Sequence, residues 1–480
     1  MNLPVSSGRA VSFTWQEAAL LLVLCGALFL DALDVSMSQV ALPSIGADLG
    51  MDPTALQWVV SGYVLGFGGF LLLGGRVADL AGRRRVLLIS LAAFVLASAA
   101  GSVAQDPSVL VATRLLKGAA AAFTAPAGLS LITTSFAEGG PRNRALTAYT
   151  ATGASGFSLG LVIGGALTEL SWRWTFALPA AVGVVILAMS VRAVPKDIVQ
   201  VHGRQRFDLA GAVLITSASV LTVLAVVDAP DQGWSSPRTL LTAACAALSF
   251  GLFVAVEHRA DPPLVRLGIL RSGPLVRANF TAASLFGAWV GFLFITTLYL
   301  QDLRAWSALE TGLAVAPSGA VVVLLASRVG SLVTSRGTAP LIVVGLASST
   351  TAYLLYQRIG PDSTYVSVVL PTVLLGGLGF ALAYGPLNIA ATQGVPAHEQ
   401  GLASGLVSSG FQLGGAFSLA VVSAVVTSVG GAQTSAGERL GGLHAGLWVC
   451  AAIALGGLLT SACPFLLQTF RVRQPSKEHA

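Results

Sequence analysis

The feature that most constrains this chain is the recurrence of long apolar segments along its 480 residues. A helix needs about 20 apolar residues to cross the hydrocarbon core of a bilayer. Because backbone polar groups in a bilayer must be bonded within the chain, such segments predict helices rather than strands or loops. We therefore predict an all-α integral membrane protein with fourteen transmembrane helices. The expected spans are 17–42, 56–75, 86–104, 108–132, 145–169, 174–194, 208–228, 239–256, 279–301, 309–330, 339–357, 364–392, 401–430 and 443–467.

The number and distribution of charged residues support this topology. Charged residues make up only 10% of the chain, which is too few to coat the surface of a soluble protein of this length. With fourteen spans, 20 of the 27 Lys and Arg residues fall on the side of the termini, five on the other side and two inside a span. Cytoplasmic loops are rich in Lys and Arg, so both termini are predicted to be cytoplasmic. The first apolar run lacks a small-residue cleavage site, so we expect it to be retained as a helix.

Two short patterns recur along the chain at nearly the same offset, 255 residues for one and 254 for the other. They indicate two six-helix halves, at 1–195 and 259–480, with two inserted helices at 196–258. The alternative is a chance match, because glycine-rich apolar sequence resembles itself easily. The matching pairs are Gly75-Arg-Val77 with Gly82 and Gly330-Ser-Leu332 with Gly337, and then Gly156-Phe157-Ser158-Leu159-Gly160 and Gly410-Phe411-Gln412-Leu413-Gly414.

Four longer motifs carry a family resemblance that spans nearly the whole chain. They are Gly75-Arg-Val-Ala-Asp79-Leu-Ala-Gly82-Arg83-Arg84-Arg85, Leu33-Asp34 followed by Ala41-Leu42-Pro43, Arg114-Leu-Leu-Lys117-Gly118, and Gly156-x-x-x-Gly160-x-x-x-Gly164-Gly165. In that order they resemble the GxLaDrxGrR loop between helices two and three, LDxTxxNxALP of helix one, RxxQG of helix four and GxxxGPxxGG of helix five. These motifs belong to the major facilitator superfamily, and together they resemble its fourteen-helix branch of drug:proton antiporters.

The resemblance implies roles for two groups of residues. The first is a gating loop that locks helix ends, with Arg83 to Arg85 serving also as an ordinary topology signal. The second is an antiporter helix that packs through its glycines. The chain departs from the family pattern at Leu161, Lys117, Ser36 and Gln39, and Asp31 is an additional acid. The gating residues are Gly75, Asp79, Gly82, Arg83 and Arg84, and the helix glycines are Gly156, Gly160, Gly164 and Gly165.

Four ionisable residues fall inside predicted spans, Asp31 and Asp34 in the first and Arg114 and Lys117 in the fourth. Each such charge costs about 2.5–3.5 kcal/mol on insertion scales, so pairing is expected. Residues three apart share one face of a helix. Antiparallel packing of the two spans then predicts that Asp34 lies opposite Arg114 and that Asp31 lies opposite Lys117.

The predicted charge cluster has two interpretations. In the first it is a proton-coupling site, because protonation of a carboxylate releases its basic partner; Asp34 is the first candidate carrier and Asp31 the second. In the second it is a static set of ion pairs that fixes helix geometry. The four charges sum to zero, and the last six spans add no acid near the middle of the membrane. We therefore do not expect a dedicated dication site.

Other polar or aromatic residues inside spans are candidates for a substrate cavity, because such groups tend to face the bundle interior. Hydrogen bonds between helices are the alternative role. No metal site or cofactor is expected, since the five histidines lack ligand spacing. The longest hydrophilic stretches, 195–207 and 257–278, are too short for an ATPase domain, so an ion gradient must supply the energy. The cavity candidates are Gln39, Trp58, Tyr63, Asn279, Gln301 and Gln412.

These inferences lead to one predicted function and two alternatives. We predict a proton-coupled antiporter that exports small amphipathic or hydrophobic drugs or metabolites by alternating access. Its partners are then the substrate, protons and the lipid bilayer of a bacterial cytoplasmic membrane, without nucleic acid, and we expect a monomer. Uptake or uniport of a nutrient by the same fold is the first alternative. A membrane receptor or enzyme is the second, but the sequence contains no catalytic constellation, so we predict that it is not an enzyme.

Overall fold

Helices account for nearly all of the described chain. The computed structural model describes residues 13–137, 140–196, 208–233, 235–260, 268–269, 272–393, 395, 400–430 and 435–472. Each α-helix in this part of the chain overlaps one predicted apolar segment, which confirms the all-α prediction. The α-helices are α1 (Trp15–Leu49), α2 (Pro53–Ala81), α3 (Arg83–Ser102), α4 (Pro107–Ser135), α5 (Gly140–Leu170), α6 (Trp174–Ala193), α7 (Leu209–Gln232), α8 (Pro237–Glu257), α9 (Gly273–Leu298), α10 (Ala308–Arg336), α11 (Thr338–Tyr356), α12 (Leu370–Thr392), α13 (Gln400–Gly430) and α14 (Ala436–Val472). Two π-helical turns, η2 (Tyr299–Leu303) and η3 (Tyr365–Val369), follow α9 and precede α12.

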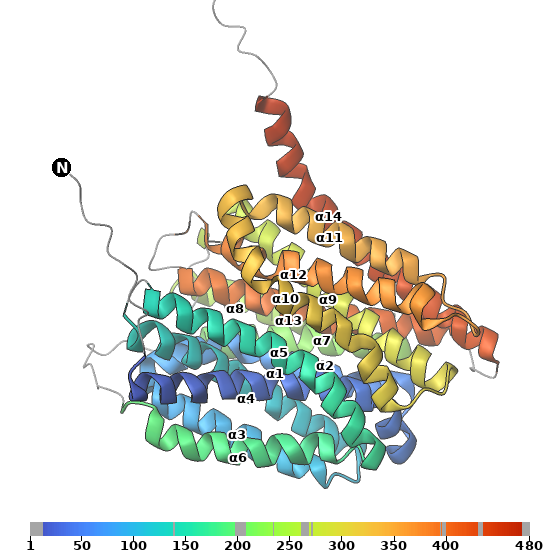
Figure 1. Ribbon diagram of the computed structural model, residues 1–480, viewed down its shortest axis with the longest axis horizontal. Helices are drawn as coiled ribbons and strands as arrows, with labels where there is room; N and C mark the ends of the chain where they lie inside the picture. Colours follow the sequence, from blue (N-terminus) through green and yellow to red (C-terminus); the bar gives the residue numbers. More distant parts are fainter. Residues whose placement is uncertain are drawn as a thin grey trace, which may run out of the picture.

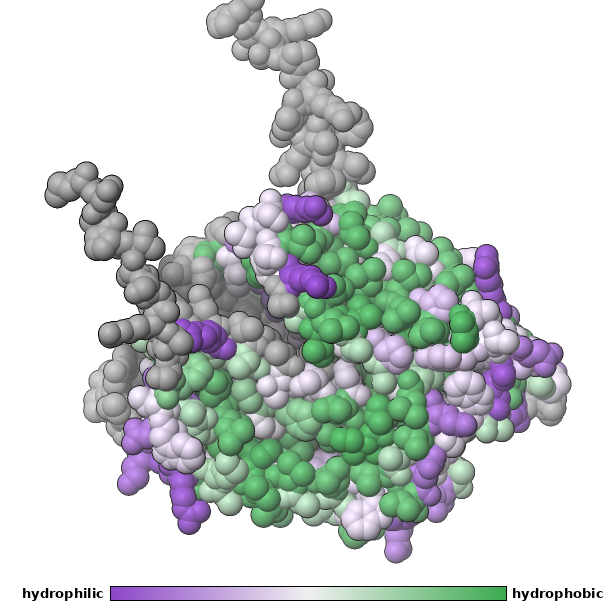
Figure 2. Space-filling model, viewed as in Figure 1, coloured by the Kyte–Doolittle hydropathy of each residue, from purple (hydrophilic) through white to green (hydrophobic). Residues whose placement is uncertain are grey.

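The apolar character of these helices fits a membrane protein. Eleven helical segments of the described chain are long and apolar enough to cross a membrane. The remaining helices α2, α5 and α7 carry shorter apolar stretches, at Ala55–Leu71, Ser155–Leu170 and Ala210–Thr222. On the face drawn in Figure 2, hydrophobic side chains cover the middle of the molecule and hydrophilic ones gather toward its two ends.

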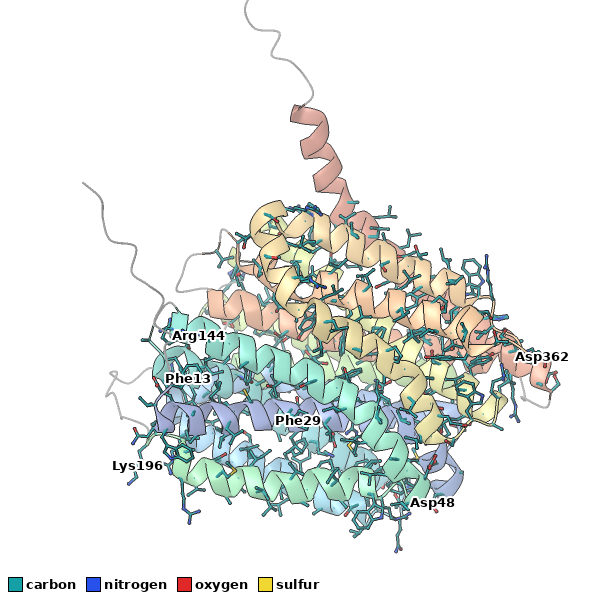
Figure 3. The ribbon with its side chains drawn as sticks, viewed as in Figure 1. Phe13, Phe29, Asp48, Arg144, Lys196 and Asp362 are labelled. Carbon is teal, nitrogen blue, oxygen red and sulfur yellow. The ribbon has the colours of Figure 1, made fainter. Side chains whose placement is uncertain are left out.

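Successive helices run in opposite directions, so their loops collect at two ends of the bundle. We call these the α1–α2 end and the α2–α3 end, after the first loop that each contains. Figure 3 shows Asp48 and Asp362 at the α1–α2 end, and Phe13, Arg144 and Lys196 at the α2–α3 end.

Local sequence signals set the helix boundaries at these ends. Asp52 and Asp106 cap α2 and α4, and each precedes a proline at the first helical position, where the missing N–H is not needed. Ser307 and Glu310 form a capping box at the start of α10. Hydrogen bonds from the Ser108 hydroxyl and backbone N–H hold the pKa of the Asp106 carboxyl below its usual value.

The repeated sequence patterns occupy equivalent places in the structure. Gly82 separates α2 from α3 with a φ of 94°, and Gly337 separates α10 from α11 with a φ of 80°. Residues with a side chain rarely adopt this backbone conformation, so each one-residue break depends on glycine. Gly156 of α5 lies against Phe29 of α1, and Gly410 of α13 lies in the same way against Asn279 of α9. The matches in sequence therefore correspond to a repeated packing arrangement.

The helices form two groups with a further pair beside them. In Figure 1, α1 to α6 (blue to green) lie below α9 to α14 (yellow to red). Within the groups, α1 packs on α5 and α2 on α4, and correspondingly α9 packs on α13. Across the groups, α2 meets α13 and α5 meets α10. Helix α7 pairs with α8 and contacts α2, where the Thr216 hydroxyl donates to the Gly69 carbonyl at 2.9 Å.

The buried apolar residues are distributed differently at the two ends. One large cluster reaches from the α1–α2 end and joins residues of both groups, such as Leu42 and Leu56 with Phe292 and Tyr356. Toward the α2–α3 end the buried residues separate into three clusters. One contains only residues of 20–194, and the other two contain only residues of 269–411. The two groups therefore share a core at one end and have their own cores at the other.

Candidate functional site

The most distinctive polar feature of the bundle is a buried cluster of charges between α1 and α4. Asp34 of α1 accepts a hydrogen bond of 2.6 Å from Nη1 of Arg114 through its Oδ2 atom. Its Oδ1 atom accepts a hydrogen bond from Nζ of Lys117. All three side chains are at most 1% exposed. The ion pair between Asp34 and Arg114 was predicted from helix spacing, and the structure confirms it.

Neighbouring helices hold the two basic side chains in place. Nε of Arg114 donates to the Val59 carbonyl of α2 at 2.7 Å, and the guanidinium carbon lies 4.8 Å from the centre of the Tyr63 ring. Nζ of Lys117 lies 5.0 Å and 4.7 Å from the ring centres of Phe94 and Phe176. Aromatic faces attract cations, so these rings stabilise a charge that has no access to water.

The predicted pairing of Asp31 with Lys117 is wrong. Both cations bind Asp34, while Asp31 accepts a hydrogen bond from the hydroxyl of Tyr63. The physical reason lies in the shape of the carboxylate. Arg114 and Lys117 are one helical turn apart on the same face of α4, and one carboxylate placed between them can bind each cation with a different oxygen. Residue spacing in the sequence does not distinguish this arrangement from two separate ion pairs.

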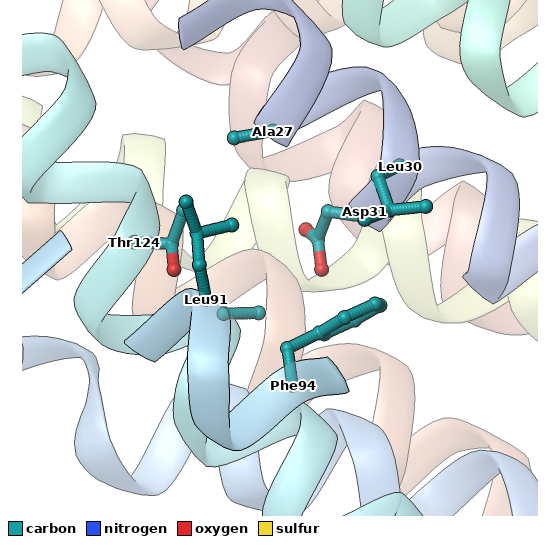
Figure 4. A pocket seen from close by; sticks show the side chains of 7 residues that line it. Ala27, Leu30, Asp31, Leu91, Phe94 and Thr124 are labelled. Atoms are coloured by element: carbon teal, nitrogen blue, oxygen red, sulfur yellow. The ribbon is translucent and has the colours of Figure 1, made fainter. Parts of the chain in front are cut away.

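Asp31 faces a small cavity rather than a cation. Figure 4 shows its carboxylate projecting from α1 toward Thr124 and Leu91, with Phe94 below it in this view. The Asp31 side chain is only half-buried, in contrast to Asp34. The cavity is lined by Ala27, Leu30, Asp31, Leu91, Phe94, Ala121 and Thr124.

The glycines predicted for the antiporter helix bring α5 close to its neighbours. A Cβ atom added at Gly156 would lie 2.7 Å from the Phe29 carbonyl oxygen, and one at Gly164 would lie 2.6 Å from the Cα atom of Met37. Gly160 lies in the same way against Leu33 and Ser36 of α1. The glycines thus allow backbone contact along the segment of α1 that carries the charge cluster.

The fourth glycine of this motif, Gly165, lies against a different helix. A Cβ atom at Gly165 would lie 2.6 Å from the Ala308 carbonyl oxygen, at the start of α10. Helix α5 therefore contacts α1 through one face and α10 through another. It connects the charge cluster of the first helix group to the second helix group.

The predicted gating loop is described only in part. Gly75 and Asp79 belong to α2, but their surroundings lie outside what the structure describes. Gly82 forms the break between α2 and α3. Nη1 of Arg83 lies 3.4 Å from the Ser130 carbonyl oxygen of α4, and Nη2 of Arg84 lies 2.6 Å from the Val191 carbonyl oxygen of α6. These bonds tie the start of α3 to other helices of the same group.

The six cavity candidates have different local surroundings. Tyr63 belongs to the charge cluster. The Gln301 side chain donates to the Val40 carbonyl at 2.9 Å, and Asn279 donates to the Leu275 carbonyl of its own helix at 3.0 Å. Trp58 and Gln412 are half-buried, Trp58 against the shared core and Gln412 beside Gly68 of α2. Gln39 is 2% exposed, and its Oε1 atom has no hydrogen-bond partner in the described chain.

Several residues of the site were not predicted from the sequence. Phe94 and Phe176 are ordinary apolar residues of their helices, so no local signal marks them as neighbours of Lys117. Gln57 and Ser61, one helical turn apart on α2, are fully buried and make no hydrogen bond through their side chains among the described residues. A glutamine followed by a serine four residues later in an apolar span was a usable signal for a polar helix face.

The fold and this buried ionic cluster define a polytopic membrane transport protein. Residues 24–419 match the model of the Major Facilitator Superfamily, and the chain belongs to that superfamily. It is therefore a transporter and not an enzyme.

Relatives and solved structures agree with this assignment. The puromycin resistance protein pur8 of Streptomyces alboniger is 37% identical over 92% of this chain and 89% of its own length. The cephamycin export protein CmcT of Amycolatopsis lactamdurans is 37% identical over 88% of this chain and 87% of its own. A peptide transporter POT in complex with sulfate has the same fold, with a TM-score of 0.68 at 16% identity and 94% of each chain covered. The relatives are thus antibiotic resistance and export proteins of this superfamily.

Proposed function

We propose that this protein is a proton-coupled antiporter that exports small amphipathic or hydrophobic drugs or metabolites by alternating access. The observation that carries the proposal is the buried cluster of Asp34, Arg114 and Lys117 beside Asp31. Ionisable groups inside a membrane are expensive and mark proton or substrate pathways. The relatives named for puromycin resistance and cephamycin export support export as the direction of transport.

Alternating access is supported by the unequal packing of the two helix groups. The shared core closes the α1–α2 end, whereas the separate cores at the α2–α3 end let the groups move apart there without exposing a common core. Rocking of two bundles around a central site is the usual motion of such transporters. Helix α5, packed through its glycines on α1 and α10, is suited to carry movement of α1 to the second group.

We base the proposed topology on the apolar spans and on the distribution of Lys and Arg residues. The chain has fourteen transmembrane helices, with six-helix bundles at 1–195 and 259–480 and two inserted helices at 196–258. The described chain begins at Phe13 at the α2–α3 end. The excess of Lys and Arg on this side supports a cytoplasmic location of both termini in a bacterial cell. The gating residues Asp79, Arg83 and Arg84 lie at this end. One chain contains the complete charge cluster, so a monomer suffices.

The proposed substrates are uncharged or amphipathic. The four charges of the cluster sum to zero, and Gln39, Gln57 and Ser61 offer buried polar atoms without partners in the described chain. A buried amide that is unpaired favours a ligand with a complementary hydrogen-bonding group.

Everted membrane vesicles with an imposed pH gradient test the function. If the protein exports by proton exchange, the vesicles accumulate substrate from a panel of dyes and antibiotics, including puromycin. The accumulation collapses with a protonophore. The variant Asp34→Asn is expected to abolish it, and Asp106→Asn, which alters a carboxylate outside the membrane spans, is expected to retain it.

The same assay separates the alternatives. Substrate release from loaded everted vesicles, with no dependence on the pH gradient, would support uptake or uniport instead. An absence of flux for every compound in wild-type vesicles would contradict the proposal of export.

A further inference from the structure

The two aspartates of α1 have different surroundings, although they lie one helical turn apart. Both oxygens of Asp34 bind a cation, and the side chain is 0% exposed. Asp31 accepts one hydrogen bond, from the neutral hydroxyl of Tyr63, and no cation of the described chain lies within ion-pair distance of it. Cations therefore balance the charge of Asp34 at both of its oxygens, whereas Asp31 has mostly apolar neighbours and no cation at either oxygen.

Asp31 is also more accessible to a proton than Asp34. The carboxylate of Asp31 projects into the cavity between α1, α3 and α4, as Figure 4 shows. Its apolar walls include Leu91 and Phe94, and the Thr124 hydroxyl donates to the Ala120 carbonyl of its own helix at 3.1 Å. Asp34 does not line this cavity. A proton can therefore reach Asp31 without breaking an ion pair, but it can reach Asp34 only by displacing a cation.

The titratable or charged groups that act electrostatically on Asp31 lie on its own helix and on α2, α4 and α5. Those from α3 that line the cavity, Leu91 and Phe94, carry no charge and do not titrate. The titratable or charged groups are Asp34 of α1, Tyr63 of α2, Arg114 and Lys117 of α4, and Tyr149 of α5.

We propose that Asp31 is the carboxyl group that takes up and releases the transported proton, while Asp34 pairs with Arg114 and Lys117 as long as Asp31 is protonated. The proton leaves Asp31 for water in the cavity, and Asp31 becomes a carboxylate. Two carboxylates then share two cations, so Lys117 or Arg114 is drawn from Asp34 toward Asp31. Because α1 and α4 carry these groups, proton release changes the contact between the two helices.

This division of roles between Asp31 and Asp34 rests on the proposed function. Infrared spectroscopy tests the division of roles without any substrate. The purified protein, carrying carboxyl-labelled aspartate, is reconstituted in lipid nanodiscs and titrated from acidic to alkaline pH. The wild type is expected to lose one protonated-carboxyl band as the pH rises. Asp31→Asn is expected to lack this band at every pH, and Asp34→Asn to retain it.

A second variant keeps the test decisive if Asp34→Asn does not fold. Tyr63→Phe keeps all four charges and removes only the hydroxyl that donates to Asp31. It is expected to move the disappearance of the band to higher pH, because the donated hydrogen bond stabilises the carboxylate. A band that persists in Asp31→Asn, an unchanged titration in Tyr63→Phe, or a wild type without a titrating aspartate would each overturn the assignment.

Transport provides a readout that a purely structural role would not change. In proteoliposomes, Asp31→Asn is expected to retain exchange of labelled puromycin across the membrane but to lose its acceleration by a pH gradient. Loss of both activities in a folded variant would contradict a specific role in coupling. If the wild type moves no puromycin, the choice of substrate fails, and the infrared titration still decides which aspartate carries the proton.

Discussion

The side-chain amide of Gln301, in the turn that follows α9, donates a hydrogen bond of 2.9 Å to the backbone carbonyl of Val40 in α1. The two residues belong to different helix groups. Val40 lies in the core that the groups share at the α1–α2 end. This bond therefore joins the groups directly where they are closed against each other.

Removal of this bond should favour opening of the α1–α2 end. A neutral hydrogen bond contributes about 0.5–1.5 kcal/mol, so Gln301→Leu is expected to raise the open population about 2- to 12-fold. Spin labels at Gln105 and Asp362, both exposed at this end, report the opening as longer distances in a background without native cysteines. Gln357→Leu is the matched control, because Gln357 donates to the His444 carbonyl within the second group. An equal shift in both variants would contradict a specific role for Gln301.

Close packing of α5 on α1 predicts that even one methyl group at Gly164 is harmful. The added Cβ atom would lie 2.6 Å from the Cα atom of Met37, and overpacking of this kind costs about 1–3 kcal/mol. Gly164→Ala is therefore expected to lower the melting temperature of the purified protein. Gly251→Ala in α8 is the control, because no atom lies within 4 Å of the new methyl group. Similar melting temperatures for the two variants would argue against the tight contact.

The arrangement of two cations around one carboxylate predicts a rescue experiment. Asp34→Asn leaves Arg114 and Lys117 buried without their partner, and breaking a buried pair costs about 3–5 kcal/mol. Adding Lys117→Met removes one of the two orphaned charges, and the Met side chain fits between Phe94 and Phe176. The double variant is expected to be more stable than Asp34→Asn in thermal unfolding followed by tryptophan fluorescence. A double variant that is less stable than the single one would contradict the shared carboxylate.

At the α1–α2 end, α1 is expected to show a weaker, salt-dependent interaction. Asp48 accepts hydrogen bonds from Nε1 of Trp172 at 3.0 Å and from Nη1 of Arg173 at 2.7 Å. Asp48 is 46% exposed and Arg173 35%, so the ion pair contributes at most about 1 kcal/mol. Asp48→Asn should lower the melting temperature slightly at low salt and less at high salt. A large loss that does not depend on salt would show that the pair is effectively buried.

The sequence by itself determined the helices and the need for pairing. Runs of about 20 apolar residues exist because a bilayer has a fixed thickness, so each α-helix could be located within several residues. The repeated glycine patterns predicted two six-helix halves. Glycine favours such repeats because it tolerates a close helix contact, as at Gly156, and a positive φ, as at Gly82. The presence of two acids and two bases in apolar spans required a buried ionic cluster.

Only the tertiary structure decided which groups are paired. Helical periodicity places Asp31 and Asp34 on one face of α1, and Arg114 and Lys117 on one face of α4, but it does not fix the rotation or axial offset of the two helices. That offset follows from contacts distant in sequence, such as the glycines of α5 against α1. It places Asp34 between both cations and leaves Asp31 to Tyr63 and the cavity, so two aspartates that look alike in the sequence acquire different chemistry.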